Sequence, residues 1–273
     1  MLGACSHVPH GKYYQDDGPH DRPPVDVMRV PDAVPRDEPL AASGNSPYTV
    51  FGVTYRPIAD GRNYRERGVA SWYGRKFHGK RTSSGEPYDM YAMTAAHRTL
   101  PLPSYVRVRN LQNGRTAIVR VNDRGPFLQN RLIDLSYTAA ARLGVLGTGT
   151  APVEIETMYA TPTATPPITT VASTSKLPPI ATAEPATTET PAPPRLAVQV
   201  GAFALYDNAR QLRDRLEAAG FTPIYIQSVP SDSGGGGSLY RVRIGPVESV
   251  AQGDQTVADV GRQGVGEALL VVE

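Results

Sequence analysis

Alternation of apolar and polar residues predicts two folded blocks, at about 68–159 and 195–273, with little regular pattern elsewhere. The first block contains short segments with a period of two, and the same alternation over 48–55 predicts one more strand leading into it. Asn113-Gly114 is a strong hairpin signal between two of these segments. Ser136 and Gly144 are typical of the two ends of a short helix over 137–143. Many short strands around one helix favour a small β-barrel. The strands predicted within the block are 69–73, 105–111, 115–121 and 153–157.

The second block has a different order of elements. Asp207 is expected to cap a helix that Gly220 ends, because Ala209, Leu212 and Leu216 fall on one helical face. A second, weaker helix is predicted over 249–262. The order βαββαβ predicts a ferredoxin-like α+β sandwich. The predicted strands are 196–200, 223–229, 239–244 and 268–272.

Two other stretches are expected to lack a core. Residues 160–194 contain 10 Thr, 9 Pro and 7 Ala and no aromatic residue, which predicts an extended linker. Residues 6–67 are rich in Pro, Asp and Arg over most of their length and are interpreted as a mostly disordered spacer. No apolar run reaches 18 residues, so no membrane-spanning helix is predicted.

Charge is uneven along the 273 residues. The net charge is only +2, yet residues 68–159 hold 12 Lys and Arg against 6 Asp and Glu. This block is either a solvated basic face or a surface for an anionic partner. The single Cys5 excludes an internal disulfide and a cysteine zinc site. Since no phosphate loop, zinc-protease or serine-hydrolase motif occurs, we expect no cofactor and no bound metal.

Candidate chemistry rests on the few acidic residues of the first block. Glu86 lies in a loop-forming segment, 82–87, and Asp123 follows a strand. Two carboxylates brought together by a fold are the equipment needed to cleave a glycosidic bond. The alternatives are that Asp123 only caps a turn and that Glu86 pairs with a basic residue. His97 is either a hydrogen-bonded core residue or a catalyst, and Trp72 and Tyr73 are either core or sugar-stacking side chains.

Several motifs of the first block occur in the order found in a known family. The block resembles the double-psi β-barrel of the rare lipoprotein A (RlpA) family, and residues 195–273 resemble a SPOR domain. The barrel motifs are Gly68-Val-Ala-Ser-Trp-Tyr-Gly74, Phe77-His-Gly79, Thr82-Ser-Ser-Gly-Glu86, Thr94-Ala-Ala-His97, Val119-Arg-Val-Asn-Asp-Arg-Gly-Pro126 and Ile133-Asp-Leu-Ser136. The SPOR motifs are Val198-Gln-Val-Gly-Ala-Phe203 and Tyr240-Arg-Val-Arg-Ile-Gly-Pro246.

The resemblance implies an endolytic lytic transglycosylase acting on peptidoglycan strands stripped of stem peptides, and concentrated at division septa by its SPOR domain. Asp123 would protonate the oxygen between N-acetylmuramic acid and N-acetylglucosamine, and attack by the C6 hydroxyl would leave a 1,6-anhydro end. Glu86 would steady the developing charge and His97 would orient a carboxylate. Barrels of this type also occur without catalysis, so a peptidoglycan-binding or wall-loosening lipoprotein is the alternative, with a structural tether as a third possibility. The expected barrel residues in contact with substrate are Tyr73, Thr82, Ser84 and Arg124.

The second block carries its own expected glycan contacts. They are Gln199, Tyr240, Arg241 and Arg243, which lie on predicted strands where alternate positions share one face. Some of them would otherwise face the helices as core. Its 7 basic and 9 acidic residues give no basic surface for nucleic acid.

The amino terminus contains a lipobox-like Leu2-Gly3-Ala4-Cys5. It predicts a lipid anchor on Cys5 and an outer-membrane lipoprotein that faces the periplasm. Because only Met1 precedes the motif, we infer a start site placed too late or a trimmed sequence. We expect a monomer, and the sequence names no protein partner at the septum.

Overall fold

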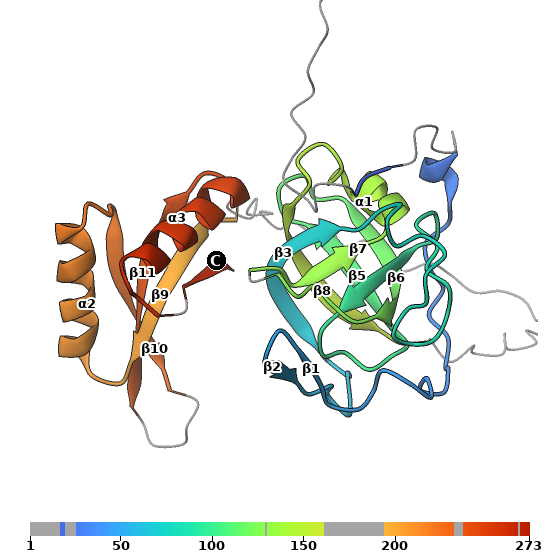
Figure 1. Cartoon of the computed structure of the whole chain (residues 1–273), viewed down its shortest axis with the longest axis horizontal. Coiled ribbons are helices and arrows are strands. Elements are labelled where there is room, and N and C mark those ends of the chain that lie inside the picture. Colours follow the sequence, from blue (N-terminus) through green and yellow to red (C-terminus); the bar gives the residue numbers. More distant parts are fainter. Residues whose placement is uncertain (1–16, 20–25, 129, 161–193, 232–236, 267) are drawn as a thin grey trace, which may run out of the picture.

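The computed structural model describes residues 17–19, 26–128, 130–160, 194–231, 237–266 and 268–273, which form two folded units (Figure 1). Cys5 and almost all of the linker expected at 160–194 lie outside these residues. Within them, no helix combines the length and the apolar character needed to cross a membrane.

The first unit is a closed barrel of six strands, in the order β3-β7-β4-β6-β5-β8. The pairs β3–β7 and β4–β6 are parallel, and the other neighbours are antiparallel. This confirms the barrel that the sequence predicts. The strands are β3 (Arg65–Trp72), β4 (Thr94–His97), β5 (Ser104–Asn110), β6 (Thr116–Asp123), β7 (Ile133–Leu135) and β8 (Ala151–Met158).

Helix α1 (Tyr137–Leu143) covers part of the barrel and has the predicted ends. The Ser136 hydroxyl accepts a hydrogen bond from the Ala139 N–H at 3.2 Å, and Gly144 adopts φ 73°, which favours glycine. Apolar side chains from all six strands fill the barrel, including Val106, Val119 and Ile155. The barrel fixes strands β6 and β7 and the loops beside them, which together carry the site described below.

The residues before the barrel differ from the spacer expected over 6–67. Residues 26–46 run along the barrel, where the Ala33 N–H donates to the Ile118 carbonyl at 3.0 Å and the Ala41 N–H to the Leu102 carbonyl at 2.8 Å. Strands β1 (Tyr48–Val50) and β2 (Val53–Tyr55) form a separate hairpin in place of the single strand expected there, and η1 (Val27–Arg29) is a short 3₁₀ helix. Main-chain groups make these hydrogen bonds, so no periodic pattern of side chains signals them.

The second unit has the predicted order βαββαβ, with a four-stranded antiparallel sheet in the order β10-β11-β9-β12. This is the ferredoxin-like arrangement. Ser249 caps its second helix, whereas the first begins at Tyr206, one residue before Asp207, which therefore lies inside the helix and does not cap it. The elements are β9 (Leu196–Phe203), α2 (Tyr206–Ala218), β10 (Ile224–Pro230), β11 (Ser238–Val247), α3 (Val250–Arg262) and β12 (Leu269–Val272).

Candidate functional site

A cleft of about 180 Å³ opens at the end of β6 and beside β7. Three carboxylates, Asp17, Asp123 and Asp134, line it together with several aromatic side chains. Apolar walls with a few converging polar groups are typical of small-molecule sites. The aromatic residues in its wall are Trp72, Tyr73, Phe77 and Phe127.

Asp123 is held in place by a loop from another part of the barrel. Its Oδ1 accepts hydrogen bonds from the Ser83 N–H (2.8 Å), the Ser83 hydroxyl (2.7 Å) and the Arg124 N–H (2.8 Å). Within the described part of the chain Oδ2 accepts none. The register between β4 and β6 shifts just before Asp123, so that Asn122 is an extra residue there. Such bulges redirect the side chains that follow them.

Asp134 and Asp17 are the two acidic residues of the cleft that sequence reasoning did not select. Asp134 is the one on a barrel strand. It lies on β7 between the buried Ile133 and Leu135, and the Ser71 hydroxyl donates a hydrogen bond to its Oδ1. Burial raises the pKa of Asp134 to about 6, although the Ser71 bond and the charge of Arg131 act in the opposite direction. A carboxyl with this pKa keeps its proton for part of the time near neutral pH. The signal that could have identified Asp134 is an acidic residue that lies between two apolar residues of a short strand.

Glu86 is held in an ion pair outside the walls of this cleft. Its two oxygens accept from the Arg120 guanidinium at 2.9 and 2.8 Å, and Oε2 also accepts from the Asn122 amide at 3.0 Å. Arg120 pairs with Glu38 as well, at 2.8 Å. Glu86 therefore makes an ion pair with a basic residue, which is the alternative to a catalytic role that the sequence left open. It still lies three residues from Ser83, in the same loop that holds Asp123.

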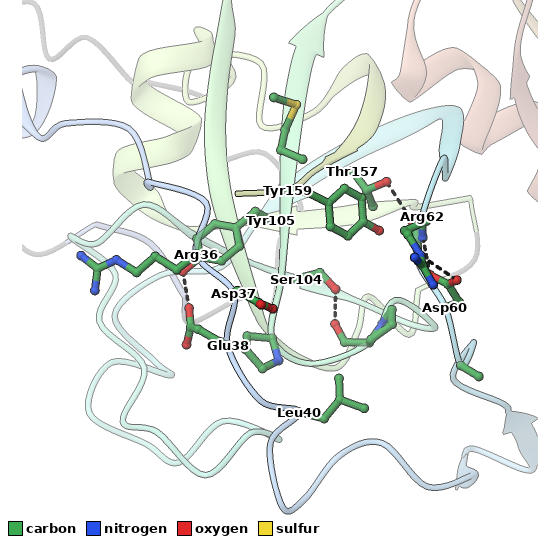
Figure 2. Close-up of a pocket in the computed structure, with 15 residues that line it drawn as sticks. Arg36, Asp37, Glu38, Leu40, Asp60, Arg62, Ser104, Tyr105, Thr157 and Tyr159 are labelled. Atoms are coloured by element: carbon green, nitrogen blue, oxygen red, sulfur yellow. Dashed lines mark hydrogen bonds and ion pairs between the residues drawn. The ribbon is translucent and has the colours of Figure 1, made fainter. Parts of the chain in front are cut away.

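A larger pocket of about 370 Å³ adjoins this network, and Glu38 and Tyr105 line it (Figure 2). Its charged residues are of both signs, and Arg62 and Asp60 are paired with each other at 2.9 Å. Since neither Asp123 nor Asp134 reaches it, the chemistry is assigned to the smaller cleft.

His97 has the surroundings of a core residue. Its Nδ1 accepts from the Thr99 and Leu100 N–H groups at 3.2 and 3.0 Å, and Nε2 lies 3.3 Å from the Tyr64 hydroxyl. Burial lowers the pKa of His97 to about 3, with nearby arginines adding to the effect, so the ring is neutral. No hydrogen bond between described residues joins this ring to Asp123 or Glu86.

The expected substrate contacts of the barrel separate into two groups. Tyr73 lines the cleft and stacks on Tyr88 at 4.0 Å between ring centroids. Thr82 and Ser84 instead bond to each other through their hydroxyls at 3.0 Å. Arg124 borders the cleft, but its guanidinium donates to backbone carbonyls, which makes it a residue that ties loops together. Those carbonyls belong to Gly44, His97 and Leu100.

The glycan contacts expected in the second unit lie on different faces of its sheet. Tyr240 packs against the apolar core and contacts Tyr206 edge to face at 5.4 Å. Gln199 and Arg243 are paired in register on neighbouring strands, and Arg243 is buried and bonded to Glu273. Tyr240 therefore packs on the core, which is one of the two positions that the sequence allowed for it. In the part of the chain that the structure describes, no cluster of three or more His, Cys, Asp or Glu has the arrangement of a metal site.

Family comparisons match both units. Residues 65–155 match the lytic transglycolase family model and residues 192–270 match the SPOR domain. The chain is 42% identical over 283 residues to an endolytic peptidoglycan transglycosylase RlpA of Pseudomonas aeruginosa, with 90% of this chain and 82% of that protein covered. The chain belongs to the RlpA family. This confirms the expected family and the enzyme class, a lytic transglycosylase.

Other RlpA relatives are similar over shorter regions. The RlpA of Vibrio cholerae is 52% identical over 156 residues, which cover 57% of this chain and 59% of that protein. The solved RlpA SPOR domain of Pseudomonas aeruginosa is 36% identical and covers 28% of this chain and 96% of that one, at a TM-score of 0.25.

Proposed function

We propose that this RlpA-family chain cleaves within peptidoglycan strands that lack stem peptides. The bond broken lies between N-acetylmuramic acid and N-acetylglucosamine, and the product ends in 1,6-anhydro-N-acetylmuramic acid. The observation that carries the proposal is the pair Asp123 and Asp134 in one aromatic-walled cleft. An acid and a base on the two sides of one bond are what the cleavage requires.

The environments of the two carboxylates support different roles. Asp134, whose pKa burial raises to about 6, is suited to give its proton to the glycosidic oxygen as the bond to C1 breaks. Oδ1 of Asp123 accepts three hydrogen bonds and Oδ2 accepts none from the described residues, so Oδ2 would take the proton of the muramoyl C6 hydroxyl while that hydroxyl attacks C1. The proton count balances, because one carboxyl loses a proton and the other gains one. This assignment moves the acid role from Asp123, as expected from the sequence, to Asp134.

Glu86 and His97 have supporting positions in this proposal. Glu86 anchors Asn122 and Arg120 on the strand that ends in Asp123, so it fixes the direction of that strand end. His97 orders the start of the following loop through the Leu100 N–H. Both are positioning residues, since their contacts run to protein groups and not into the cleft.

Location and targeting are also part of the proposal. The SPOR match supports binding of the second unit to the same stripped strands at division septa. Gln199 and Arg241 alternate with core residues on their strands and are suited to bond sugar hydroxyls from the face that does not pack on the apolar core. We further propose a lipid anchor on Cys5, an outer-membrane position facing the periplasm, and a monomeric protein.

The test is incubation of the purified full chain with intact and with amidase-treated sacculi, followed by mass analysis of released fragments. We expect anhydro-ended products from the treated sacculi, and losses of at least about 100-fold for Asp123→Asn and Asp134→Asn, in the range of general acid–base contributions. Asp26→Asn is the matched control, because the Asp26 side chain is exposed and does not line the cleft.

Retention on the treated sacculi without any released product would replace the enzyme with a glycan-binding or wall-loosening protein. Normal product release by both cleft variants would refute the acid–base assignment.

A further inference from the structure

A carboxylate of this chain already occupies a polar corner of the cleft. Asp17 Oδ2 accepts from the Gly74 N–H at 2.9 Å, and Oδ1 accepts from the Lys76 N–H at 2.9 Å. The Arg75 N–H between them donates to the Gly18 carbonyl at 2.9 Å. Three successive backbone N–H groups therefore point at one acidic segment, an arrangement that is typical of anion sites in loops.

Gly74 shows that this corner is shaped for close approach. A Cβ atom at this position would lie 2.3 Å from the Gly18 carbonyl oxygen and 3.0 Å from Asp17 Oδ1. Gly74 is not among the residues with a positive φ, so its backbone conformation does not require glycine. The missing side chain instead leaves room for what lies against residues 74–76.

The corner belongs to the same cleft as the two catalytic candidates. Asp17, Tyr73 and Phe77 line it with Asp123 and Asp134. The segment 17–19 comes from far upstream in the sequence and contributes no strand or helix. The carboxylate of Asp17 thus occupies the position that the carboxylate of a bound ligand would need.

We propose that the backbone N–H groups of residues 74–76 form a carboxylate-binding subsite of the glycan cleft, which Asp17 occupies until substrate displaces it. The ligand group is the free lactyl carboxylate of N-acetylmuramic acid. The identity of this ligand rests on the proposed function. In a strand that keeps its stem peptides this carboxylate is an amide, which carries no charge and continues into a peptide.

The subsite therefore gives a physical reason for preferring stripped strands. A free carboxylate accepts from the Gly74 and Lys76 N–H groups as Asp17 does, while an amide offers one neutral oxygen and adds bulk where Gly18 now lies. Asp17 acts as a tethered competitor, since it is always present at high local concentration. If it fills the subsite nine-tenths of the time, the apparent affinity for the strand falls about tenfold.

The experiment measures equilibrium binding of the full chain to two preparations of one stripped glycan. In the first the lactyl carboxylates are free, and in the second they are converted to methylamides. Trp72 lines the cleft and is the single tryptophan, so its fluorescence reports on the barrel and not on the SPOR unit. The variants are Asp17→Ala and Asp26→Ala, the second a matched acidic control in the same amino-terminal region.

We expect Asp17→Ala to bind the free-carboxylate glycan about tenfold more tightly, with little change for the methylamide glycan, and Asp26→Ala to behave as wild type. A second variant, Gly74→Ala, places a Cβ atom 3.0 Å from the position of Asp17 Oδ1, which the ligand carboxylate would take, and should abolish the gain when it is added to Asp17→Ala. Unchanged binding by Asp17→Ala overturns the proposal. An equal gain on both glycans also overturns it, since the segment would then only shield the cleft.

Binding does not depend on cleavage, which separates this inference from the proposed activity. A carboxylate preference without anhydro products would remove the enzyme and leave the subsite. Anhydro products without a carboxylate preference would remove the subsite and leave the enzyme.

Discussion

Replacing Asp134 by asparagine removes the charge of the side chain while nearly preserving its shape and its bond to Ser71. The pKa of Asp134 is raised from 3.8 to about 6 by burial, so the folded barrel holds this proton more tightly than the unfolded chain does. As pH rises from about 4 to about 6, the unfolded chain releases the proton first, and the stability of the barrel falls. Above pH 6 the loss is complete and constant.

The magnitude follows from the difference between the two pKa values. A difference of about 2, at ~1.4 kcal/mol for each, gives an upper value of about 3 kcal/mol. Because Asp134 keeps some surface on the open cleft, water reduces the effect, and we expect roughly 1–3 kcal/mol. The Asp134→Asn barrel should be more stable than wild type by this amount at pH 7.5 and about equal to it at pH 4, while losing its activity.

The assay is urea unfolding of the full chain at both pH values. Unfolding is monitored through the fluorescence of Trp72, which lies in the barrel. Asp26→Asn controls for the loss of one surface carboxylate. The reasoning is refuted if the stability difference between wild type and Asp134→Asn is the same at pH 4 and pH 7.5. It is also refuted if the variant is the less stable protein at pH 7.5.

Three further changes test the surroundings of the cleft. Ser83→Ala removes one of three donors to Asp123, so we expect kcat to fall about tenfold or more, with an unchanged melting temperature, in a product-release assay. His97 is neutral because burial lowers its pKa to about 3, so its ring carbon resonances should not move between pH 8 and 5, and a titration in this range would contradict the buried geometry. Arg120→Met leaves Glu38 and Glu86 without their shared cation and should lower barrel stability by about 1–2 kcal/mol at pH 7. The hydrogen bond from Arg120 lowers the pKa of Glu38, so its contribution to stability is lost as pH falls, and the difference between wild type and variant should shrink at acid pH in thermal melts.

Local signals in the sequence account for the parts of the fold that were predicted well. The hairpin of β5 and β6 turns at Asn113-Gly114, and α1 begins and ends at its predicted caps. Each of these features depends on a few neighbouring residues and on backbone preferences that hold in any protein. The pattern of short strands indicated a small barrel, and the family resemblance added its double-psi type, which no local pattern specifies.

The parts that escaped prediction depend on pairing between distant segments. Strands β4 and β7 have only four and three residues, too few to show a period. The extra residue at Asn122 exists only relative to β4, and it helps to set where Asp123 points. For the same reason Asp134 was passed over in favour of Glu86, since only strand pairing brings β7 beside the end of β3 and next to β4.

Replacement of Asp17 by the lactyl carboxylate at residues 74–76 would leave the protonation of Asp134 nearly unchanged. Asp17 places one negative charge in the cleft that contains Asp134 and Asp123. When a lactyl carboxylate replaces Asp17, one negative charge replaces another, so the electrostatic environment of Asp134 is nearly conserved and the raised pKa persists in the complex. Burial, and not the charge of Asp17, raises the pKa of Asp134, so the acid keeps its raised pKa whichever strand lies in the cleft. The subsite would thus select the stripped strand through binding alone, and the protonation of the acid that cleaves the strand would not depend on the exchange.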